Sequence, residues 1–511
     1  MVYPCSGEST GTVSSTSRFS RRRFGKMFLT LLPMSALGFA PSEKRNAPTN
    51  LEFASSDAKL VAAFRWAKDE ALSYVFDGDP VGPWYEAALP GRQAFCMRDT
   101  AHQADGAHAL GLARCNHNML RKFAENISAS KDWCSYWEID RLNRPAPVDY
   151  KSDAEFWYNL PANYDILDTC YRMFLWTGDR SYVEDPVFVN FYDRTMNEYT
   201  GRWDLGPDRV MERESDIPTP PFFRGDPTYE ESSSDNLVGI DLLATQYAAY
   251  RAYAGMQSIR GKAQKARQAL QTAAQVKSLI NTRWWDQQGE YFHAFFTKRH
   301  QFAGRAGGDV LYRDAAESGI KTSSALRTVW ATMKSEPKTA VETKSHYAEI
   351  LYRYGDADGA YAQLVDLTSE GRERREYPEV SYSAVGAIVT GLMGVHAMPG
   401  PSLMEMVSGR PFEPVVETMP RLTAKTEWAE LAELPIQETV ISARHEGNGS
   451  TRMTNHGTHA LRWRATFAGS FVGLVVDGKV RPARVDTRVS GKVTWAEMVV
   501  PAGSVVEVKT T

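Results

Sequence analysis

The feature that most constrains the fold is a helical periodicity that recurs from about residue 57 to residue 398. In residues 57–75, apolar side chains recur at three- and four-residue spacings behind Ser56, a candidate N-cap. Similar patterns occupy about residues 101–127, 155–177, 186–200, 238–256, 258–284, 343–354, 357–369 and 382–395. Turn signals such as Tyr354-Gly355-Asp356 favour helical hairpins. We find no fixed-period repeat, which favours a closed toroid over a solenoid.

The period of the sequence changes after Pro399-Gly400-Pro401. Beyond about residue 436, apolar and polar residues alternate in short runs such as Ala460–Phe467 and Lys492–Val500. We therefore expect a mainly α chain, with an (α/α)6 toroid over residues 57–398 and a C-terminal antiparallel β-sandwich over residues 402–511. The sandwich could cover one side of the toroid or bind carbohydrate.

Residues 1–40 have the features of an export signal. Ser20–Lys26 place paired arginines before an aromatic residue, and a short apolar run from Met27 ends in small residues near Ala40. This order is typical of a signal peptide, and the paired arginines indicate the twin-arginine route. The apolar run is shorter than the roughly 20 residues that span a bilayer. We expect a linker over residues 41–56 and a periplasmic or secreted mature protein; the alternative is a basic tail before one buried helix.

Charge and metal-ligand spacing exclude several function classes. The formal net charge is -3, so no basic field exists for nucleic acid, and no later stretch is apolar enough for stable membrane insertion. The cysteines form no Cys-x-x-Cys pair, and His102, His108 and His117 are not spaced as a helix-face pair. We therefore expect no metal and no cofactor. The aromatic content of 11% is consistent with an oligo- or polysaccharide partner.

A loop that enters a helix near residue 100 contains a first candidate carboxylate. Asp99 follows Arg98 and precedes Thr100, a candidate N-cap, so Asp99 would lie just outside the helix. His102 and Asp105 share a helical face. Hydrolysis of a glycosidic bond without a metal needs two carboxyl groups, one to protonate the leaving oxygen and one to activate water or attack the anomeric carbon. Asp99 either supplies the first of these groups or merely caps the helix.

A second candidate segment is residues 372–382, where arginines and glutamates alternate in a proline-broken loop. Tyr377 and Tyr382 interrupt the charges as sugar contacts would. Glu376 and Glu379 are candidates for the second carboxylate. The alternative is a solvated charge run.

The order of these features resembles the six-hairpin glycosidase superfamily, notably the α-L-rhamnosidase type and related β-glucuronidases. The resemblance covers about residues 57–511 and includes the early Arg-Asp…Asp-Gly segment, the late acidic loop and a β-sandwich that ends in Val500–Ser504. It implies that Asp99 is the general acid, that Asp105 holds the substrate and that Glu379 or Glu376 is the general base.

Two departures from the rhamnosidase type favour another sugar. The chain lacks the Gly-Trp before Asp105 and the Trp-Glu of the late motif. A guanidinium binds a carboxylate bidentately, so the density of arginines favours an acidic sugar. The candidate uronate-binding residues, unless they pair with neighbouring glutamates, are Arg92, Arg98, Arg374 and Arg375.

Other residues between the two segments could line the cleft. The candidates for substrate contact are Trp137, Glu138, Trp157, Asn159 and Glu212. Glu342 and His346 share a helical face near Tyr347 and form a further acid-base pair of lower rank.

The sequence therefore predicts an exo-acting glycoside hydrolase that releases a uronic acid, β-glucuronate first, from oligo- or polysaccharides with inversion. Three alternatives stay open. They are an α-L-rhamnosidase-like hydrolase, a polysaccharide lyase on the same toroid that uses His102, Tyr377 and Tyr382, and a non-catalytic glycan-binding protein. The oligomeric state is not fixed by the sequence.

Overall fold

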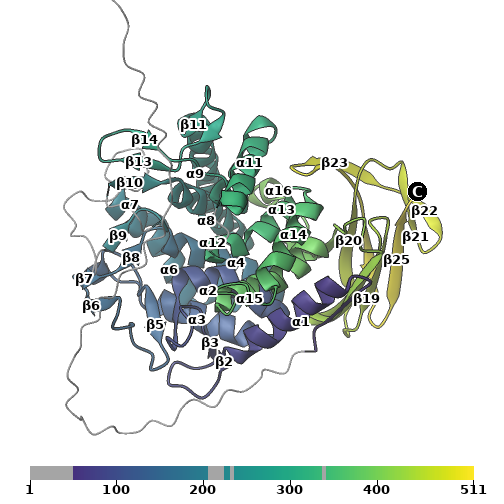
Figure 1. The fold of residues 1–511 in the computed structure, drawn as a ribbon, viewed down its shortest axis with the longest axis horizontal. Coiled ribbons are helices and arrows are strands. Elements are labelled where there is room, and N and C mark those ends of the chain that lie inside the picture. Colours follow the sequence, from purple (N-terminus) through teal and green to yellow (C-terminus); the bar gives the residue numbers. More distant parts are fainter. Residues whose placement is uncertain (1–49, 205–223, 231–234, 336–340) are drawn as a thin grey trace, which may run out of the picture.

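A closed ring of helices and a two-sheet β domain lie side by side in the computed structural model (Figure 1). The structure describes residues 50–204, 224–230, 235–335 and 341–511. The predicted export signal, most of the predicted linker and Glu212 lie outside these ranges.

The inner helices of the ring pack against one another in succession, and the last of them packs against the first. They are α2 (Met97–Ala109), α4 (Ala162–Thr177), α8 (Ile240–Ile259), α10 (Gly308–Tyr312), α13 (Tyr347–Arg353) and α15 (Pro378–Gly386). This closure confirms the predicted (α/α)6 toroid.

A second layer of helices surrounds the inner ring. Its members are α1 (Ala58–Ser73), α3 (Ala113–Glu125), α6 (Pro186–Arg194), α9 (Ala263–Thr282), α11 (Ile320–Ser335) and α14 (Ala357–Thr368). Shorter helices are α5 (Ser181–Glu184), α7 (Thr200–Trp203), α12 (Val341–Ser345) and α16 (Leu403–Val407). In the described residues, no helix combines the length and apolar character needed to cross a membrane.

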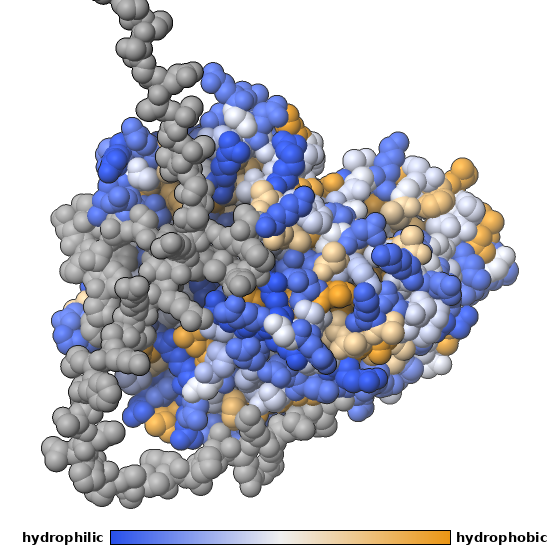
Figure 2. Space-filling view, viewed as in Figure 1, coloured by the Kyte–Doolittle hydropathy of each residue, from blue (hydrophilic) through white to orange (hydrophobic). Residues whose placement is uncertain are grey.

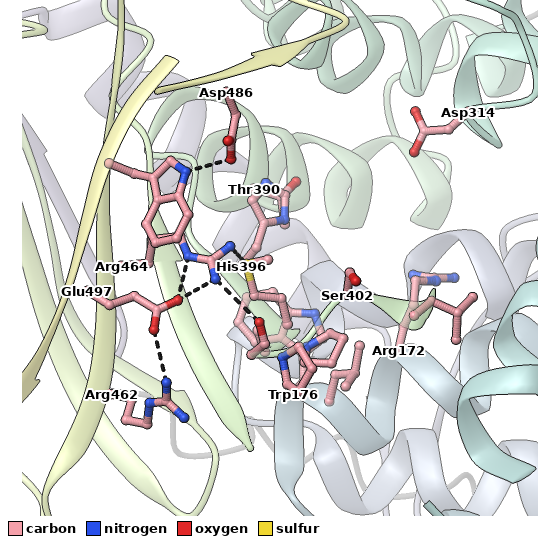
Figure 3. Close-up of a pocket in the computed structure, with 18 of the residues that line it drawn as sticks. Arg172, Trp176, Asp314, Thr390, His396, Ser402, Arg462, Arg464, Asp486 and Glu497 are labelled. Carbon is pink, nitrogen blue, oxygen red and sulfur yellow. Dashed lines mark hydrogen bonds and ion pairs between the residues drawn. The ribbon is translucent and has the colours of Figure 1, made fainter. Parts of the chain in front are cut away.

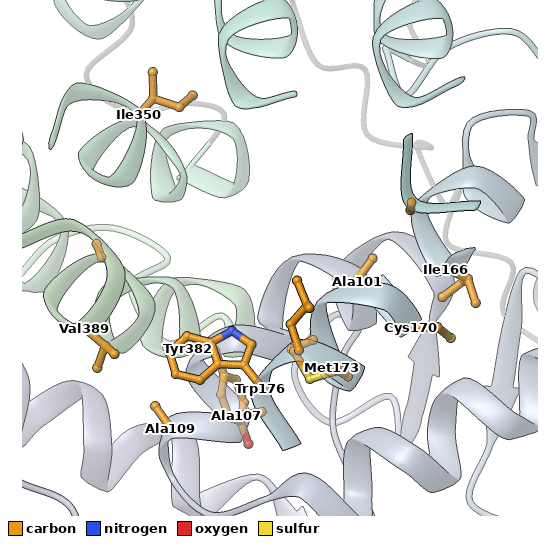
Figure 4. Packing of buried hydrophobic residues seen from close by; sticks show 14 of the residues in the cluster. Ala101, Ala107, Ala109, Ile166, Cys170, Met173, Trp176, Ile350, Tyr382 and Val389 are labelled. Atoms are coloured by element: carbon orange, nitrogen blue, oxygen red, sulfur yellow. The ribbon is translucent and has the colours of Figure 1, made fainter. Parts of the chain in front are cut away.

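The ring closes where α2 and α15 cross. Gly106 lies against the backbone carbonyl of Tyr382, and a Cβ at this glycine would collide with that carbonyl. Figure 4 shows Tyr382 in the buried cluster together with Ala107 and Ala109 of α2, the helix against which α15 packs. The hydroxyl of Tyr382 donates to the carbonyl of Ala71 over 2.9 Å, and its ring lies 4.8 Å from that of Tyr85. The prediction that Tyr382 contacts substrate is therefore wrong, because the side chain is part of the core.

The β domain consists of two sheets. The first has the strand order β1 (Glu52–Ser55), β17 (Trp428–Ile436), β18 (Thr439–Glu446), β19 (Ser450–Asn455), β25 (Val505–Thr510), β21 (Gly473–Val476) and β22 (Lys479–Pro482). The second has the order β15 (His396–Pro399), β16 (Pro414–Thr418), β20 (Leu461–Ala468), β24 (Gly491–Val500) and β23 (Arg484–Arg488).

Three details of the β domain correct the sequence prediction. Residues 52–55 were expected in a linker, but they pair antiparallel with β17, because Leu51 and Phe53 are buried there. Strand β15 begins at His396, within the range predicted for the toroid. The pair β16–β20 is parallel, so the sandwich is not wholly antiparallel.

Short strand pairs connect the helices of the toroid. They are β2 (Val75–Phe76) with β3 (Trp84–Tyr85), β4 (Ala94–Cys96) with β5 (Glu138–Asp140), β6 (Tyr150–Ser152) with β7 (Glu155–Phe156), β8 (Tyr158–Asn159) with β9 (Arg224–Asp226), β11 (Trp285–Asp286) with β12 (Tyr291–Phe292), and β10 (Asn236–Gly239) with β13 (Phe295–Thr297) and β14 (Phe302–Ala303). Several of them precede an inner helix directly, so they fix where that helix begins.

Candidate active site

Five of the inner helices carry an acidic residue in the first turn at one end of the ring, whereas Glu349, in the first turn of the short α13, lines a cavity that also includes residues of the β domain. Each of the following lies in the first turn of its helix: Asp99 in α2, Asp165 in α4, Asp241 in α8, Asp309 in α10 and Glu379 in α15. His346 occupies the N-cap position of α13. The N-terminal end of a helix carries a partial positive charge, which favours carboxylates there. We call this end of the ring the front.

Glu379 is held at the front by two histidines. Its Oε1 lies 3.0 Å from Nδ1 of His102 and 2.7 Å from Nε2 of His346. The side chain is 3% exposed, and its Oε2 has no hydrogen-bond partner in the described part of the chain. Burial pushes the pKa of Glu379 up, but the hydrogen bonds from both histidines outweigh burial and hold the pKa well below its usual value. Glu379 is therefore ionised at neutral pH.

The pKa of Asp99 is shifted in the opposite direction to that of Glu379. Burial and then the negative charge of Glu379 raise the pKa of Asp99 to about 6, against the opposing effects of Arg98 and Cys96. Nε of Arg98 is 3.2 Å from Asp99 Oδ1. The helix begins at Met97 with Cys96 as its cap, so Asp99 lies inside the first turn and Thr100 is not the cap. The two carboxylates thus share one site but differ in how readily they hold a proton.

Aromatic rings border this pair of carboxylates. The ring of His102 meets Tyr229 and Tyr312 edge-on, with centroid distances of 6.3 and 5.6 Å. The guanidinium of Arg98 lies 5.5 Å from the centroid of the Tyr229 ring. Trp137 is also within reach, 6.3 Å from the ring of Tyr229. The front therefore combines apolar ring surfaces with polar groups, as sugar-binding sites do.

A second polar network holds Tyr229 in place. Its hydroxyl donates to Asp165, which also pairs with the buried Arg313. Its backbone N–H donates to Asp241 over 2.6 Å. Sequence reasoning missed these residues. The available signal was the recurrence of an acid in the first turn of successive inner helices, which becomes visible once every second helix is assigned to the inner ring.

Several predicted site residues belong to a different surface. Glu376 is exposed, and its backbone carbonyl accepts from the hydroxyl of Tyr74. Arg375 lies over the ring of Trp66 at 5.1 Å. With their neighbours they border a shallow depression of about 360 Å³ whose lining does not include Glu379. Of the two candidate glutamates, only Glu379 therefore lies with Asp99.

The remaining residues of the late loop form ion pairs. Arg374 pairs with Glu342 and lies over the ring of Tyr377 at 4.3 Å. The predicted pairing of Glu342 with His346 as acid and base is therefore not what the structure contains, because His346 bonds Glu379. Tyr377 is the N-cap of α15 and does not meet His102 in any described contact.

The early candidates divide into supporting and structural residues. Arg92 pairs with Glu138 and Asp149, at 3.0 Å in each case. Trp157 donates to Asn159 over 2.8 Å, and Asn159 in turn donates to the carbonyl of Thr228. Asn159 is fully buried and therefore anchors the backbone before Tyr229.

Asp105 does not lie with Asp99. It pairs with Arg172 and lines a cavity that also includes residues of the β domain. Because the two aspartates are six residues apart on one helix, they lie nearly two turns apart, about 9 Å along the axis. The resemblance implied that Asp105 holds the substrate; in the structure its carboxylate pairs with Arg172 and lies away from Asp99.

One group of side chains could hold a metal ion. The donor atoms of His102, His346 and Glu379 all lie within 4.8 Å of one another. In the structure both imidazole nitrogens bond one carboxylate oxygen, so hydrogen bonds alone account for their approach.

The ring of hairpins with carboxylates at one end is the six-hairpin, glycosidase-like toroid fold. No protein-family model and no curated protein sequence matches the chain. Solved structures of similar fold include an α-L-rhamnosidase from Dictyoglumus thermophilum, with a TM-score of 0.58 and 12% identity over 91% of this chain and 50% of that one.

Two further solved structures have the same toroid. A Streptomyces avermitilis α-L-rhamnosidase complexed with L-rhamnose gives a TM-score of 0.52 at 11% identity, over 90% of this chain and 42% of that one. A sialidase gives 0.54 at 10% identity, over 80% of this chain and 40% of that one. The chain spans half or less of the length of these three proteins. The likeness confirms the fold.

Proposed function

We propose that this protein is a glycoside hydrolase in which Asp99 is the general acid and Glu379 the general base. The observation that carries the proposal is the opposite displacement of the two carboxyl pKa values within one site, Asp99 upward to about 6 and Glu379 downward. Such a split separates the proton donor from the proton acceptor. It arises because burial acts on both groups, while the histidines offset it only for Glu379.

The geometry suits a hydrolytic step. Protonated Asp99 donates to the glycosidic oxygen as the bond to the anomeric carbon breaks. Glu379 Oε1 is occupied by the two histidines, which leaves Oε2 to accept a proton from the attacking water. Attack from the opposite face of the sugar inverts the anomeric carbon.

We propose that the substrate is an exposed terminal uronic acid, β-glucuronate first, of an oligo- or polysaccharide. We also propose that the enzyme is exported. Arg98 supports this proposal, because its guanidinium lies between Asp99 and Tyr229 at the front. Arg374 and Arg375 no longer contribute to it, since they belong to the other surface.

An α-L-rhamnoside is the second candidate substrate, favoured by the two rhamnosidases of similar fold. The polysaccharide-lyase alternative needs a tyrosine base beside His102. Tyr377 and Tyr382 do not lie there, and Tyr229 is a poor candidate for this role. Burial and the adjacent Asp165 raise the pKa of Tyr229 well above its usual value, which disfavours a phenolate base.

The test is turnover of a panel of aryl glycosides that includes β-glucuronide and α-L-rhamnoside, together with uronate-containing polysaccharides. Release of free glucuronate, lost in Asp99→Asn and impaired in Arg98→Gln, is the expected result. Release of rhamnose that is insensitive to Arg98→Gln would replace the uronate by the second candidate. An unsaturated product, detected by its ultraviolet absorbance, would overturn hydrolysis altogether.

A further inference from the structure

A cavity lies at the other end of the toroid, where the inner helices face the β domain. Its volume is about 1130 Å³, and its lining includes Arg172 and Trp176 of α4, Glu349 of α13 and Arg464 of β20. Figure 3 shows side chains of the two domains facing each other across it, and Figure 2 shows the surface indented between the domains. We call this end of the toroid the rear. The cavity exists only because both domains contribute walls.

The acidic residues of the rear cavity are already neutralised or hydrogen-bonded. Glu349 pairs with Arg353 at 2.6 Å, and Glu497 pairs with Arg462 at 2.9 Å. The indole N–H of Trp495 donates to Asp486 over 2.6 Å. The other carboxylates in the lining, each paired with an arginine, are Asp105, Asp168, Asp314 and Glu405.

Three arginines of the lining form no direct ion pair in the described residues, although, against the lowering effect of burial, the nearby Asp314 and Asp168 help to raise the pKa of Arg251. They are Arg251 on α8, Arg481 on β22 and Arg484 on β23, and all three are exposed. Arg251 lies over the ring of Tyr247 at 5.5 Å, and Arg484 over the ring of Trp495 at 5.1 Å. Stacking of this kind orients a guanidinium while leaving its N–H groups available to a ligand. The charge that the cavity leaves uncompensated is therefore positive.

The size and chemistry of the cavity define its ligand. Small-molecule sites in proteins occupy roughly 300–1,000 Å³, so this volume exceeds that of a single small anion or sugar. Unpaired guanidinium groups bind carboxylates bidentately. We propose that the rear cavity is a binding site for a carboxylated oligosaccharide, completed by the β domain and bordered on the side of the front by Tyr312 and Arg313. The choice of an oligosaccharide rests on the proposed function, whereas the need for carboxylates rests on the three guanidinium groups.

The proposal also explains the β domain as part of a binding surface. Arg481 and Arg484 come from neighbouring segments of that domain, whereas Arg251 comes from the toroid. A ligand that spans the three guanidinium groups would contact both domains at once. Binding would therefore hold an acidic polymer to the protein at a place other than the front.

The experiment measures binding of an oligouronate and of its carboxyl-reduced, neutral counterpart by calorimetry. The host protein carries Asp99→Asn and Arg98→Gln, which stops turnover and removes the arginine of the front. The test variant adds Arg251→Gln, Arg481→Gln and Arg484→Gln. The matched control adds Arg267→Gln, Arg299→Gln and Lys425→Gln, which removes the same charge at exposed positions outside the cavity lining.

We expect the oligouronate to bind the host and the control equally, and the test variant at least tenfold more weakly. The affinity should fall with added salt, and the neutral counterpart should bind at least tenfold more weakly than the oligouronate. Equal affinities of the two triple variants, or of the charged and neutral ligands, would overturn the proposal. So would inorganic phosphate displacing the oligouronate at matched concentration, since the cavity would then hold only a small anion. Circular dichroism verifies that each variant is folded.

Discussion

The front and the rear are opposite ends of the same helices, yet they treat carboxylates differently. Helix α2 carries Asp99 at the front and Asp105 at the rear, and α13 is capped by His346 at the front, while Glu349 in its first turn lines the rear cavity. At the front Asp99 and Asp165 also lie beside arginines, but the partners of Glu379 are imidazoles. At the rear, by contrast, Asp105 and Glu349 face guanidinium groups. Arginine keeps its charge at every working pH, but imidazole does not.

This difference affects the protonation of individual carboxylates at the two ends. Burial pushes the pKa of Glu349 up, but Arg353 outweighs it and holds the pKa below its usual value. At the front, the pKa of His102 falls to about 4 through burial and the neighbouring His346, so His102 is a neutral hydrogen-bond donor near neutral pH. At the front Asp99 is able to hold a proton, while Glu349 at the rear is kept ionised by Arg353. Burial also raises the pKa of Asp105, in spite of Arg172.

Neutralising a front carboxylate should have the largest effect of all on activity. We expect Asp99→Asn and Glu379→Gln each to lower kcat by about 10²- to 10⁴-fold, the usual contribution of a positioned acid or base. The matched control is Glu349→Gln, the same change at the rear, which should stay within about threefold of the parent. Steady-state turnover of the preferred glycoside checks both. Full activity of Asp99→Asn would contradict its role as the general acid, and with it the functional difference between the front and the rear.

The sequence predicted the two domains because their periodicities differ and persist over long segments. It located Asp99 and Glu379 through short motifs next to helix starts. It could not separate Glu376 from Glu379, because these residues are only three apart and Pro378 begins the helix between them. The helix start turns Glu379 inward and leaves Glu376 exposed.

The histidine partners of Glu379 could not be predicted from the sequence for a different reason. His102 is 277 residues away from it, and the contact depends on the closure of the ring between α2 and α15. The cavity at the rear depends likewise on how the β domain docks. Local sequence patterns carry no information about the closure of the ring or about the docking of the β domain.

At the rear, the same neutralisation should cost stability. Glu349→Gln leaves Arg353 with a weaker partner, and hydrogen bonds to charged groups contribute about 1.5–3 kcal/mol. Because the folded pKa of Glu349 is depressed, its contribution is present at neutral pH and is lost as pH falls through that pKa. Urea unfolding at pH 7 and at a series of pH values below the usual pKa of a glutamate measures this. A difference between variant and parent that is equally large at all of these pH values would contradict the charge argument.

Removing one histidine should shift the pH profile more than it lowers the maximal rate. His346→Phe deletes the 2.7 Å hydrogen bond to Glu379, so the pKa of Glu379 should rise. A loss of about 1.5–3 kcal/mol corresponds to roughly 1–2 pH units. The acidic limb of kcat/KM should therefore move to higher pH, while the alkaline limb, set by Asp99 with a pKa of about 6, should move little. His346→Gln, which retains an N–H donor, is the control. An unshifted acidic limb in His346→Phe would show that Glu379 is not the base.

We expect a chelator to have the smallest effect on activity. It tests directly whether the charge at the front is set by protons or by a metal ion. His102, His346 and Glu379 approach within 4.8 Å, a spacing that a divalent ion could also bridge. A bound ion would fix the charge at the front as arginines fix it at the rear, and the protons of the histidines would no longer hold Glu379. We expect prolonged dialysis against EDTA to leave kcat and Tm unchanged, and elemental analysis to find well under one equivalent of zinc, manganese or iron. Loss of activity that one of these ions restores would assign the front to metal chemistry, and the two ends would then differ only in which cation sets their charge.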